Sequence, residues 1–275
     1  MADVPLDDYE AVLNSAMRKR RELLQSLARK MRLSNRTQCV VSWDYPTHEA
    51  IIREVLRSAP DLVITTSHRH GKLARWILSN TDWELIRSCP CPVWFSRSDS
   101  LPAKPRALVA IDPRHTHAKP ARLDDRLLMS ARTLTSQLGG GISIVHAFDA
   151  PPPAARYAGT SALSLRLRAN GSGGDPGPKA RELVNRFAEN HRVAAADTFA
   201  LPGDATEVIA NTVRQLAADV LVMGAVSRRR LDQPVIGNTA EKVIDAVSCD
   251  ILVIKPRGFR IGVARRVAKS KRVPA

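Results

Sequence analysis

The sequence has few of the features that mark membrane, secreted or disulfide-bonded proteins. It contains no run of about 20 apolar residues, the length that spans a bilayer. Acidic residues between Asp3 and Glu10 and the absence of an apolar leader argue against secretion, so we expect a cytoplasmic protein. In such a setting cysteines are expected to be reduced core thiols. The four cysteines are Cys39, Cys89, Cys91 and Cys249.

Patterns of catalytic and metal-binding residues are equally scarce. Three short motifs, His68-Arg-His70, His115-Thr-His117 and Cys89-Pro-Cys91, lack the paired spacing of a zinc module. No Ser–His–Asp set and no pair of carboxylates falls at corresponding strand ends. We therefore expect no metal and no enzyme, or at most weak nucleotide hydrolysis.

Acidic residues are too few to balance the basic ones. The chain has 42 basic and 27 acidic residues, a formal charge of +15. Residues 18–32 hold seven basic side chains, and residues 257–275 hold seven and no acid. Such a field attracts polyanions non-specifically and in a salt-dependent way. Because no aromatic residues interleave the basic ones, we favour a solvated helix face and a disordered basic tail over a nucleic-acid site.

Between residues 106 and 254, short apolar runs alternate with segments whose apolar residues have helical spacing. This alternation predicts a parallel sheet covered by helices on both faces. Such sheets bind ligands at the carboxyl ends of their strands. The expected strands are 106–112, 142–147, 197–201, 219–224 and 251–254, and the expected helices are about 123–138, 179–191, 204–217 and one that opens at 237–240.

Part of this pattern occurs twice. Residues 49–96 match residues 207–254 without a gap at an offset of 158, with ten identities in 48 positions. This is an internal duplication. The first copy has no counterpart of the strand at 106–112, its helix or the strand at 142–147. We therefore predict an exposed sheet edge there, which requires either a partner or residues upstream. The expected domains are an incomplete 1–98, a complete 105–256 and the tail 257–275.

One loop of the second copy has the features of a phosphate site. It begins with Gly224-Ala-Val-Ser227, continues for nine residues and ends with Gly237-Asn238-Thr239. A glycine at a strand end lets a ligand approach the backbone, and a glycine before a helix exposes N–H groups at the positive end of the helix dipole. Asn238 and Thr239 add side-chain donors.

Two further features belong to the same loop. Asp112 ends the first strand of the complete domain, and it lies beside the loop if that strand neighbours the strand at 219–224. A carboxylate there accepts hydrogen bonds from a ribose hydroxyl or an adenine amino group. Arg228, Arg229 and Arg230 lie within the loop, where they would meet phosphates.

This arrangement of Asp112, Gly224 and Gly237, present in a tandem chain, resembles the universal stress protein family, in particular its E type. The resemblance covers residues 5–256. It implies two α/β units, the first lacking its N-terminal strands, and a stress-tolerance protein, including tolerance of DNA damage, with ATP or a related nucleotide in the second unit. It also implies that the last strands, near 92–96 and 250–254, pair with each other as an intramolecular pseudo-dimer.

The sequence departs from the family's nucleotide-binding pattern at several positions. Ser227 stands where the pattern has glycine, and Asn238 replaces the usual Ser or Thr. The first copy has Thr66, Arg69 and Ser79 at the positions of Gly224, Ser227 and Gly237, so we expect no nucleotide there.

Two other functions stay open. One is a scaffold for an apolar or lipid-like ligand between the two halves, because Trp76, Trp83 and Trp94 all lie near the end of the first copy. The other is a polyanion-binding module that uses the basic tail. Further self-association is compatible with each function, and none needs a membrane.

Overall fold

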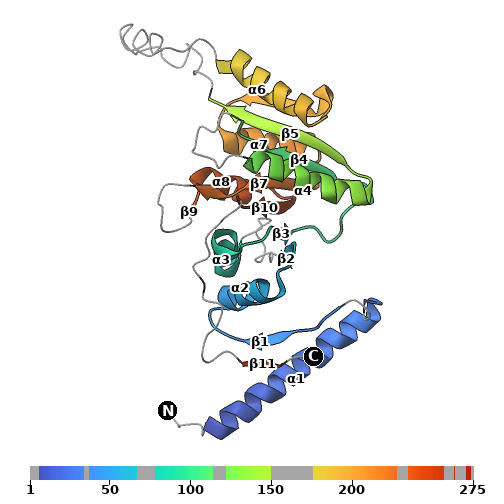
Figure 1. The fold of residues 1–275 in the computed structure, drawn as a ribbon, viewed down its shortest axis with the longest axis vertical. Coiled ribbons are helices and arrows are strands. Elements are labelled where there is room, and N and C mark those ends of the chain that lie inside the picture. The colour runs from blue at the N-terminus through green and yellow to red at the C-terminus, as the bar shows by residue number, and fades with distance from the viewer. Residues whose placement is uncertain are drawn as a thin grey trace, which may run out of the picture. The chain divides into compact units, whose positions relative to one another are not determined.

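The structure is a computed structural model, and it describes residues 6–33, 37–66, 78–113, 122–149, 176–227, 235–256, 263 and 271–273 (Figure 1). The chain divides into two compact units. The first comprises Met1–Ala59 with Val263–Ala275, and the second comprises Pro60–Gly262. In the described part of the chain, no helix is long and apolar enough to cross a membrane.

The second unit is built on a seven-stranded sheet with the order β2-β3-β10-β7-β4-β5-β6. Neighbouring strands are parallel except β3 and β10, which are antiparallel. The strands are β2 (Val63–Thr66), β3 (Val93–Ser96), β4 (Arg106–Ala110), β5 (Gly141–Phe148), β6 (Thr198–Pro202), β7 (Val220–Gly224) and β10 (Asp250–Ile254).

Helices cover this sheet on both faces. The connections β4-α4-β5 and β5-α6-β6 run outward, whereas β6-α7-β7 and β7-α8-β10 run back across the sheet. Right-handed crossovers in opposite directions place their helices on opposite faces. Leu127 of α4 and Val184 of α6 share one buried cluster with Val109 of β4. The helices are α3 (Asn80–Ser88), α4 (Leu123–Leu138), α6 (Pro176–Asn190), α7 (Ala205–Gln215) and α8 (Asn238–Ala246), with a 3-10 turn at Ala195–Asp197.

This architecture confirms the predicted fold class, an α/β fold that occurs as two copies in tandem. The first copy lacks its N-terminal strands. The helix expected at 123–138 has those bounds, and the strands of the second copy lie within two residues of their predicted ends. β4 and β7 are neighbours, as the placement of Asp112 beside the loop requires.

The two copies join through their last strands. Val93, Trp94 and Phe95 of β3 pair with Val253, Leu252 and Ile251 of β10, which confirms the predicted pairing. At the offset of 158 these are the same three positions of each copy in reverse order. The junction is therefore centred on Trp94 and Leu252 and has approximate two-fold symmetry.

A pair of buried cations repeats the symmetry of this junction. Arg97 and Lys255 occupy equivalent positions just after β3 and β10, and each is 2% exposed. Arg97 Nη1 donates to the carbonyl oxygens of Ile244 (2.9 Å) and Val247 (2.6 Å) at the end of α8. Lys255 Nζ donates to the carbonyl oxygen of Leu85 (3.0 Å) near the end of α3. Each copy thus supplies a cation to the negative end of the other copy's last helix.

The first unit contains α1 (Leu6–Lys30), β1 (Val41–Trp43), α2 (Thr47–Ser58) and β11 (Lys271–Val273). β11 pairs antiparallel with β1, so the expectation of a tail without regular structure is wrong for Lys271–Val273. β1 is the counterpart of β6, which pairs with β5. Because the first copy has no β5, an edge of β1 is left for the tail. The rest of 257–275, except residue 263, lies outside the described residues.

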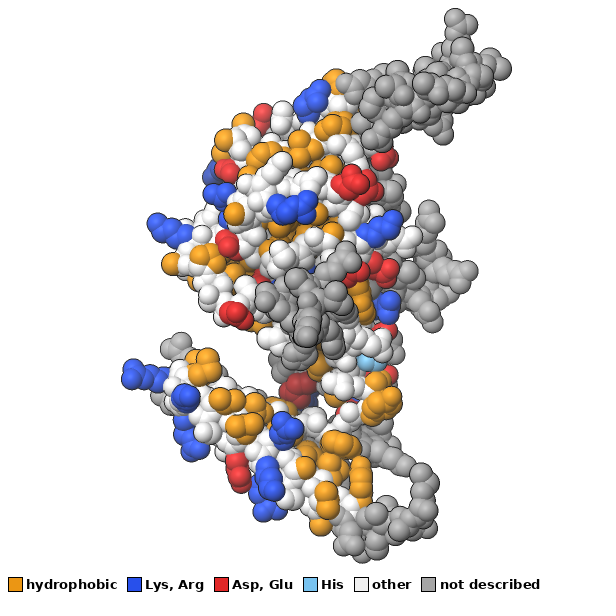
Figure 2. Space-filling model, turned by 180° about the vertical axis from the view of Figure 1, so that it is seen from behind, with side chains coloured by type: hydrophobic (Ala, Val, Ile, Leu, Met, Phe, Trp, Pro, Cys, Tyr) orange, Lys and Arg blue, Asp and Glu red, His pale blue; other side chains and the backbone are white. Residues whose placement is uncertain are grey.

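The missing strands also leave apolar surface exposed. Among the described strands, β2 pairs with β3 alone, and Ile64 on β2 is 66% exposed. Within the described residues the predicted exposed edge is therefore present. On α1, apolar side chains such as Val12 and Leu23 are exposed beside basic ones (Figure 2).

Backbone geometry extends the duplication upstream. After α1 and α6 the chain turns through Arg32 and Arg192, with positive φ values of 56° and 52°. The residue after each arginine forms the same backbone hydrogen bond, from Leu33 N to the carbonyl oxygen of Ala28 and from Val193 N to that of Ala188. The two helices are therefore counterparts, although their alignment needs a two-residue shift.

Candidate functional site

The carboxyl ends of β4 and β7 form the centre of the candidate site. Leu108 pairs with Leu221 and Val109 with Val222 in the parallel register, so both strands end at the same sheet edge. Asp112 follows β4 and Gly224 ends β7. The topology therefore brings these two predicted residues to one edge.

Packing of α4 is a sufficient reason for glycine at position 224. A Cβ atom added there would lie 2.9 Å from Leu123 Cδ2, at the start of α4, and 3.8 Å from the carbonyl oxygen of Ile254. Leu123 is buried, so its side chain has little room to move. Glycine at this position is therefore explained by the packing of helix against strand, and the close approach of a ligand stays a prediction.

The turn after β4 is held by a buried carboxylate. The Asp112 amide donates to Asp124 Oδ1 and Oδ2, at 3.2 and 3.3 Å. Asp124 lies in the first turn of α4 and is buried. The role of Asp124 was not predicted from the sequence. The Asp112 side chain itself is half-buried at the sheet edge, which suits a residue that accepts hydrogen bonds from a ligand.

A short hairpin brings Gly237 back to this edge. β8 (Val226–Ser227) pairs antiparallel with β9 (Val235–Ile236), and Gly237 N donates to the carbonyl oxygen of Ala225 at 3.3 Å. Gly237 is therefore one hydrogen bond away from the residue that follows Gly224. The side chain of Ser227 and all of Arg228, Arg229 and Arg230 lie outside the described residues.

Helix α8 begins at this point without a side-chain cap. Gly237 is its N-cap residue, and no described side chain bonds to the cap. Glu241 N donates to the Gly237 carbonyl oxygen at 3.1 Å, which leaves the first-turn N–H groups pointing out of the helix. Asn238 and Thr239 are both exposed in this turn. The geometry suits an anion, which the helix dipole also favours.

The same helix terminus in the first copy is closed. Ser79, the counterpart of Gly237, accepts a hydrogen bond from Asp82 N at 3.2 Å, while Asp82 Oδ2 accepts bonds from Ser79 N and Ser79 Oγ, both at 2.8 Å. This capping box satisfies the backbone and places a carboxylate where an anion would bind. Ala240 stands at the equivalent position of the second copy. The capping box is therefore a local reason to expect no anion at this terminus, and the absence of a nucleotide site in the first copy stays a prediction.

Several sequence candidates are not brought into this site. Thr66 ends β2, and Cys89 and Cys91 precede β3 on the other side of the junction. Three candidates of the first copy, Trp76, Arg69 and the His68–His70 motif, lie outside the described residues, as does the His115–His117 motif. Among the residues that the structure describes, no group of three or more His, Cys, Asp or Glu side chains is arranged to hold a metal ion.

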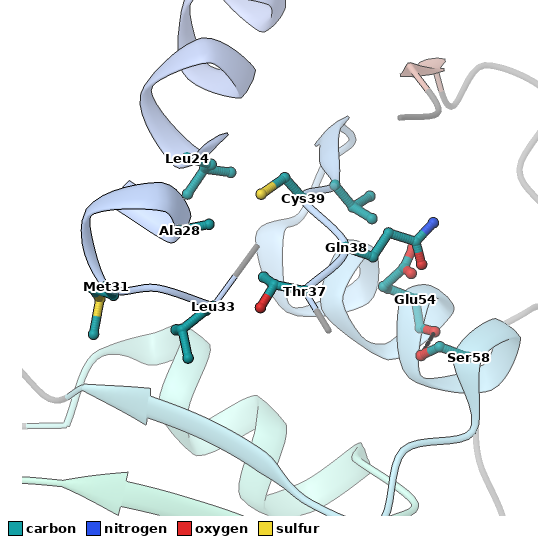
Figure 3. A pocket seen from close by; sticks show the side chains of 10 residues that line it. Leu24, Ala28, Met31, Leu33, Thr37, Gln38, Cys39, Glu54 and Ser58 are labelled. Atoms are coloured by element: carbon teal, nitrogen blue, oxygen red, sulfur yellow. Dashed lines mark hydrogen bonds between the residues drawn. The ribbon is translucent and has the colours of Figure 1, made fainter. Parts of the chain in front are cut away.

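The first unit contains a separate hollow of about 500 Å³ (Figure 3). Apolar side chains of α1 and of the turn after it line one side, and polar groups of residues 37–40 and α2 line the other. In this view Leu24 and Ala28 of α1 lie opposite Cys39 and Thr37, and Glu54 and Ser58 of α2 lie beyond them. Its lining residues are Leu24, Ala28, Met31, Leu33, Thr37, Gln38, Cys39, Val40, Glu54 and Ser58.

Comparison with known proteins agrees with this architecture. The family model described as "Universal stress protein family" matches residues 2–97 and 106–255. Universal stress protein E of Escherichia coli (strain K12) is 31% identical over 229 residues, which are 81% of this chain and 69% of that protein. Universal stress protein E of Photorhabdus laumondii is 31% identical over 226 residues, 80% of this chain and 69% of the relative.

Solved structures give the same assignment. A crystal structure from Pseudomonas aeruginosa UCBPP-PA14, described as a universal stress protein, has a TM-score of 0.67 and 26% identity, and covers 86% of this chain and 78% of its own. One from Archaeoglobus fulgidus DSM 4304 has a TM-score of 0.60 at 17% identity, with 93% and 84% covered, and supports the fold. The chain therefore belongs to the universal stress protein family and carries the family's domain twice in tandem.

Proposed function

We propose that the second copy binds an adenine nucleotide such as ATP, and that the protein acts in stress tolerance, including resistance to DNA damage, as a binding protein rather than as a catalyst. The observation that carries the proposal is the difference between the two helix termini. α8 begins at Gly237 without a side-chain cap, at the same sheet edge as Asp112, whereas α3 is closed by its own Ser79–Asp82 pair. Asp112 would accept hydrogen bonds from the ribose or the base, and the α8 terminus would bind phosphate.

The contrast between the copies supplies the experiment. The double substitution Gly237→Ser with Ala240→Asp transfers the capping box of α3 to α8. Gly237 has φ −72° and ψ 138°, and Ser79 has φ −70° and ψ 164°, so serine fits the backbone. The cap should stabilise α8 by about 1 kcal/mol while its carboxylate repels phosphate. In equilibrium dialysis with labelled ATP we expect binding to fall at least about tenfold.

A matched control opens the other helix. Ser79→Gly with Asp82→Ala removes the capping box of α3 and should leave ATP binding by the second copy unchanged. Equal ATP binding by the parent and the Gly237→Ser, Ala240→Asp variant would contradict the proposed phosphate position. The absence of binding by the parent at millimolar ATP would contradict the nucleotide proposal itself.

Ser227 provides an independent test of the same site. We propose that its side chain narrows the path to the phosphates, because the family's binding pattern has glycine at this position. Ser227→Gly is therefore expected to increase ATP affinity several-fold in the same dialysis. If the affinity does not change, Ser227 does not line the phosphate path.

The hollow in the first unit favours a second candidate function, the binding of a small apolar ligand. Its volume lies in the range of small-molecule sites, and Leu24, Ala28 and Met31 supply an apolar wall opposite polar groups (Figure 3). Titration with a fluorescent fatty acid tests this function, with Ala28→Phe as the variant that fills the hollow. Binding that is unaffected by this substitution would place the ligand elsewhere.

A further inference from the structure

Two thiols lie against each other between α3 and β3. Cys89 Sγ and Cys91 Sγ are 3.7 Å apart, and both cysteines are free. Cys89 is fully buried, whereas Cys91 is partly exposed. Disulfide sulfurs lie about 2 Å apart, so the Cys89–Cys91 pair is a reduced pair that a small movement of one sulfur would bring within bonding distance.

A buried cation lies beside the pair. Because β3 and β10 are antiparallel, with Val93 opposite Val253, the residue after β10 reaches the segment before β3. Lys255 Nζ donates to the carbonyl oxygen of Cys89 and, at 3.0 Å, to that of Leu85. The ammonium group therefore lies next to the backbone of the buried cysteine, where it stabilises a negative charge on sulfur.

The pair loses its first proton easily and holds the second one between the two sulfurs. The hydrogen bond from Cys91 lowers the pKa of Cys89 to about 7, burial opposes this shift, and the charge of Lys255 adds to it. The same hydrogen bond raises the pKa of Cys91. The first negative charge of the pair therefore lies on Cys89, and Cys91 holds the remaining proton against it.

The second copy has the same backbone arrangement without a thiol pair. Cys249 is the counterpart of Cys91, Val247 that of Cys89, and Arg97 that of Lys255. Arg97 bonds the end of α8 as Lys255 bonds the end of α3, so this packing does not need two cysteines. Burial raises the pKa of Cys249 to about 12, which makes it an unreactive reference thiol within the same molecule.

We propose that Cys89 and Cys91 form a redox-active dithiol that small disulfides oxidise to an intramolecular disulfide. The partly exposed Cys91 thiol passes its proton to the Cys89 thiolate as it attacks one sulfur of a small disulfide RSSR, forms a mixed disulfide and releases RS⁻, which takes that proton from Cys89. The Cys89 thiolate then attacks the Cys91 sulfur, forms the Cys89–Cys91 bond and releases the second RS⁻. Two electrons pass from the two cysteines to RSSR, and the two protons end on two RSH molecules.

The test uses the full chain and oxidised glutathione at pH 7. After each time point free thiols are trapped with N-ethylmaleimide, and trypsin releases residues 88–97, which carry both cysteines in one peptide. In the parent protein this peptide should no longer react with N-ethylmaleimide and should be two hydrogen atoms lighter than the reduced peptide. Its oxidation should be at least about tenfold faster than the reaction of Cys249 with glutathione. The variant Cys89→Ser should stop at a glutathione mixed disulfide on Cys91, whereas Cys249→Ser should behave as the parent does.

Two results would overturn the proposal. One is a parent peptide that is alkylated twice at every glutathione ratio, or that carries glutathione without forming the internal bond. The other comes from repeating the reaction in urea, where the rate advantage over Cys249 should fall to within about twofold because fold and Lys255 no longer act on the thiols. An advantage that persists in urea would come from the local sequence and not from the folded site.

Discussion

At the scale of single residues, three buried ionisable side chains define the junction between the copies. Asp250 accepts hydrogen bonds from Trp94 Nε1 (2.9 Å), Arg97 N (2.8 Å) and Ser98 Oγ (2.8 Å). Arg97 and Lys255 bond the carbonyl ends of the helices across the junction. These contacts join residues about 150 positions apart, so their loss is felt by both copies.

The first prediction concerns Asp250. Replacing Asp250 with alanine leaves the Trp94 and Arg97 donors buried without their acceptor, so we expect the free energy of unfolding to fall by about 3 kcal/mol or more. Urea unfolding followed by tryptophan fluorescence measures the change. Glu182→Ala is the control, because the Glu182–Arg186 ion pair is mostly exposed and should change stability by less than about 0.5 kcal/mol. A loss as small as the control's would show that the Asp250 bonds contribute little.

The second prediction uses the pH dependence of Lys255. Burial lowers the pKa of Lys255 from 10.5 to about 8, so between these values the unfolded chain binds more protons than the folded one. Stability therefore rises with pH in this window. Relative to Lys255→Gln, the free energy of unfolding of the parent should increase between pH 8 and pH 10.5, by an amount on the order of 3 kcal/mol. A constant difference across that window would mean that Lys255 titrates normally.

At the scale of elements, both copies end a helix on a strained alanine. Ala59 after α2 and Ala217 after α7 have positive φ values of 45° and 47°, a region that costs alanine about 1 kcal/mol. Ala59 and Ala217 align with each other at the offset of 158 and are one of the ten identities between the copies. The identity reflects shared backbone geometry.

The third prediction follows from this strain. Ala217→Gly should raise the free energy of unfolding by up to about 1 kcal/mol, because glycine adopts the left-handed conformation without steric cost. The control is Ala194→Gly, at a position with φ −64°, which should lower stability by a few tenths of a kcal/mol. Urea unfolding of both variants gives the comparison. A destabilised Ala217→Gly protein would indicate that the alanine methyl group is needed for packing.

The elements show how far sequence reasoning reaches. Helix α4 was predictable because its apolar spacing is regular and Gly139 ends it with φ 64°. The role of Gly224 was only partly predictable, since its contact with Leu123 depends on how α4 packs on the sheet. The Lys255 and Leu85 contact joins residues 170 positions apart and has no local signal. The capped terminus of α3 depends on Asp82, which a comparison of the glycine positions alone overlooks.

At the scale of the whole molecule, the chain has two compact units whose boundary does not coincide with the repeat boundary. The first copy contributes α1, β1 and α2 to one unit, and β2, α3 and β3 to the other. The last strand of the first copy is thus part of the large sheet, while its first elements pair with residues from the other end of the chain.

The fourth prediction tests this division. Deleting residues 271–275 removes the partner of β1, so amide hydrogens of Val41–Trp43 should exchange at least about tenfold faster with deuterium. Amides of β3 and β10 should keep their protection, because their hydrogen bonds lie in the other unit. Hydrogen exchange with mass spectrometry reports both regions in one experiment. Unchanged exchange at β1 would mean that β11 does not protect it.

The symmetrical register of β3 and β10 has a consequence for the order of the two copies along the chain. Trp94 and Leu252 occupy the same position of each copy and pair with each other. The strand pairing at the junction therefore does not depend on which copy comes first in the chain. A circular permutant that begins near residue 100 and returns to the first copy through a new linker would close the same central sheet. What distinguishes the halves lies at the sheet margins, where five strands continue on one side of the junction and two on the other.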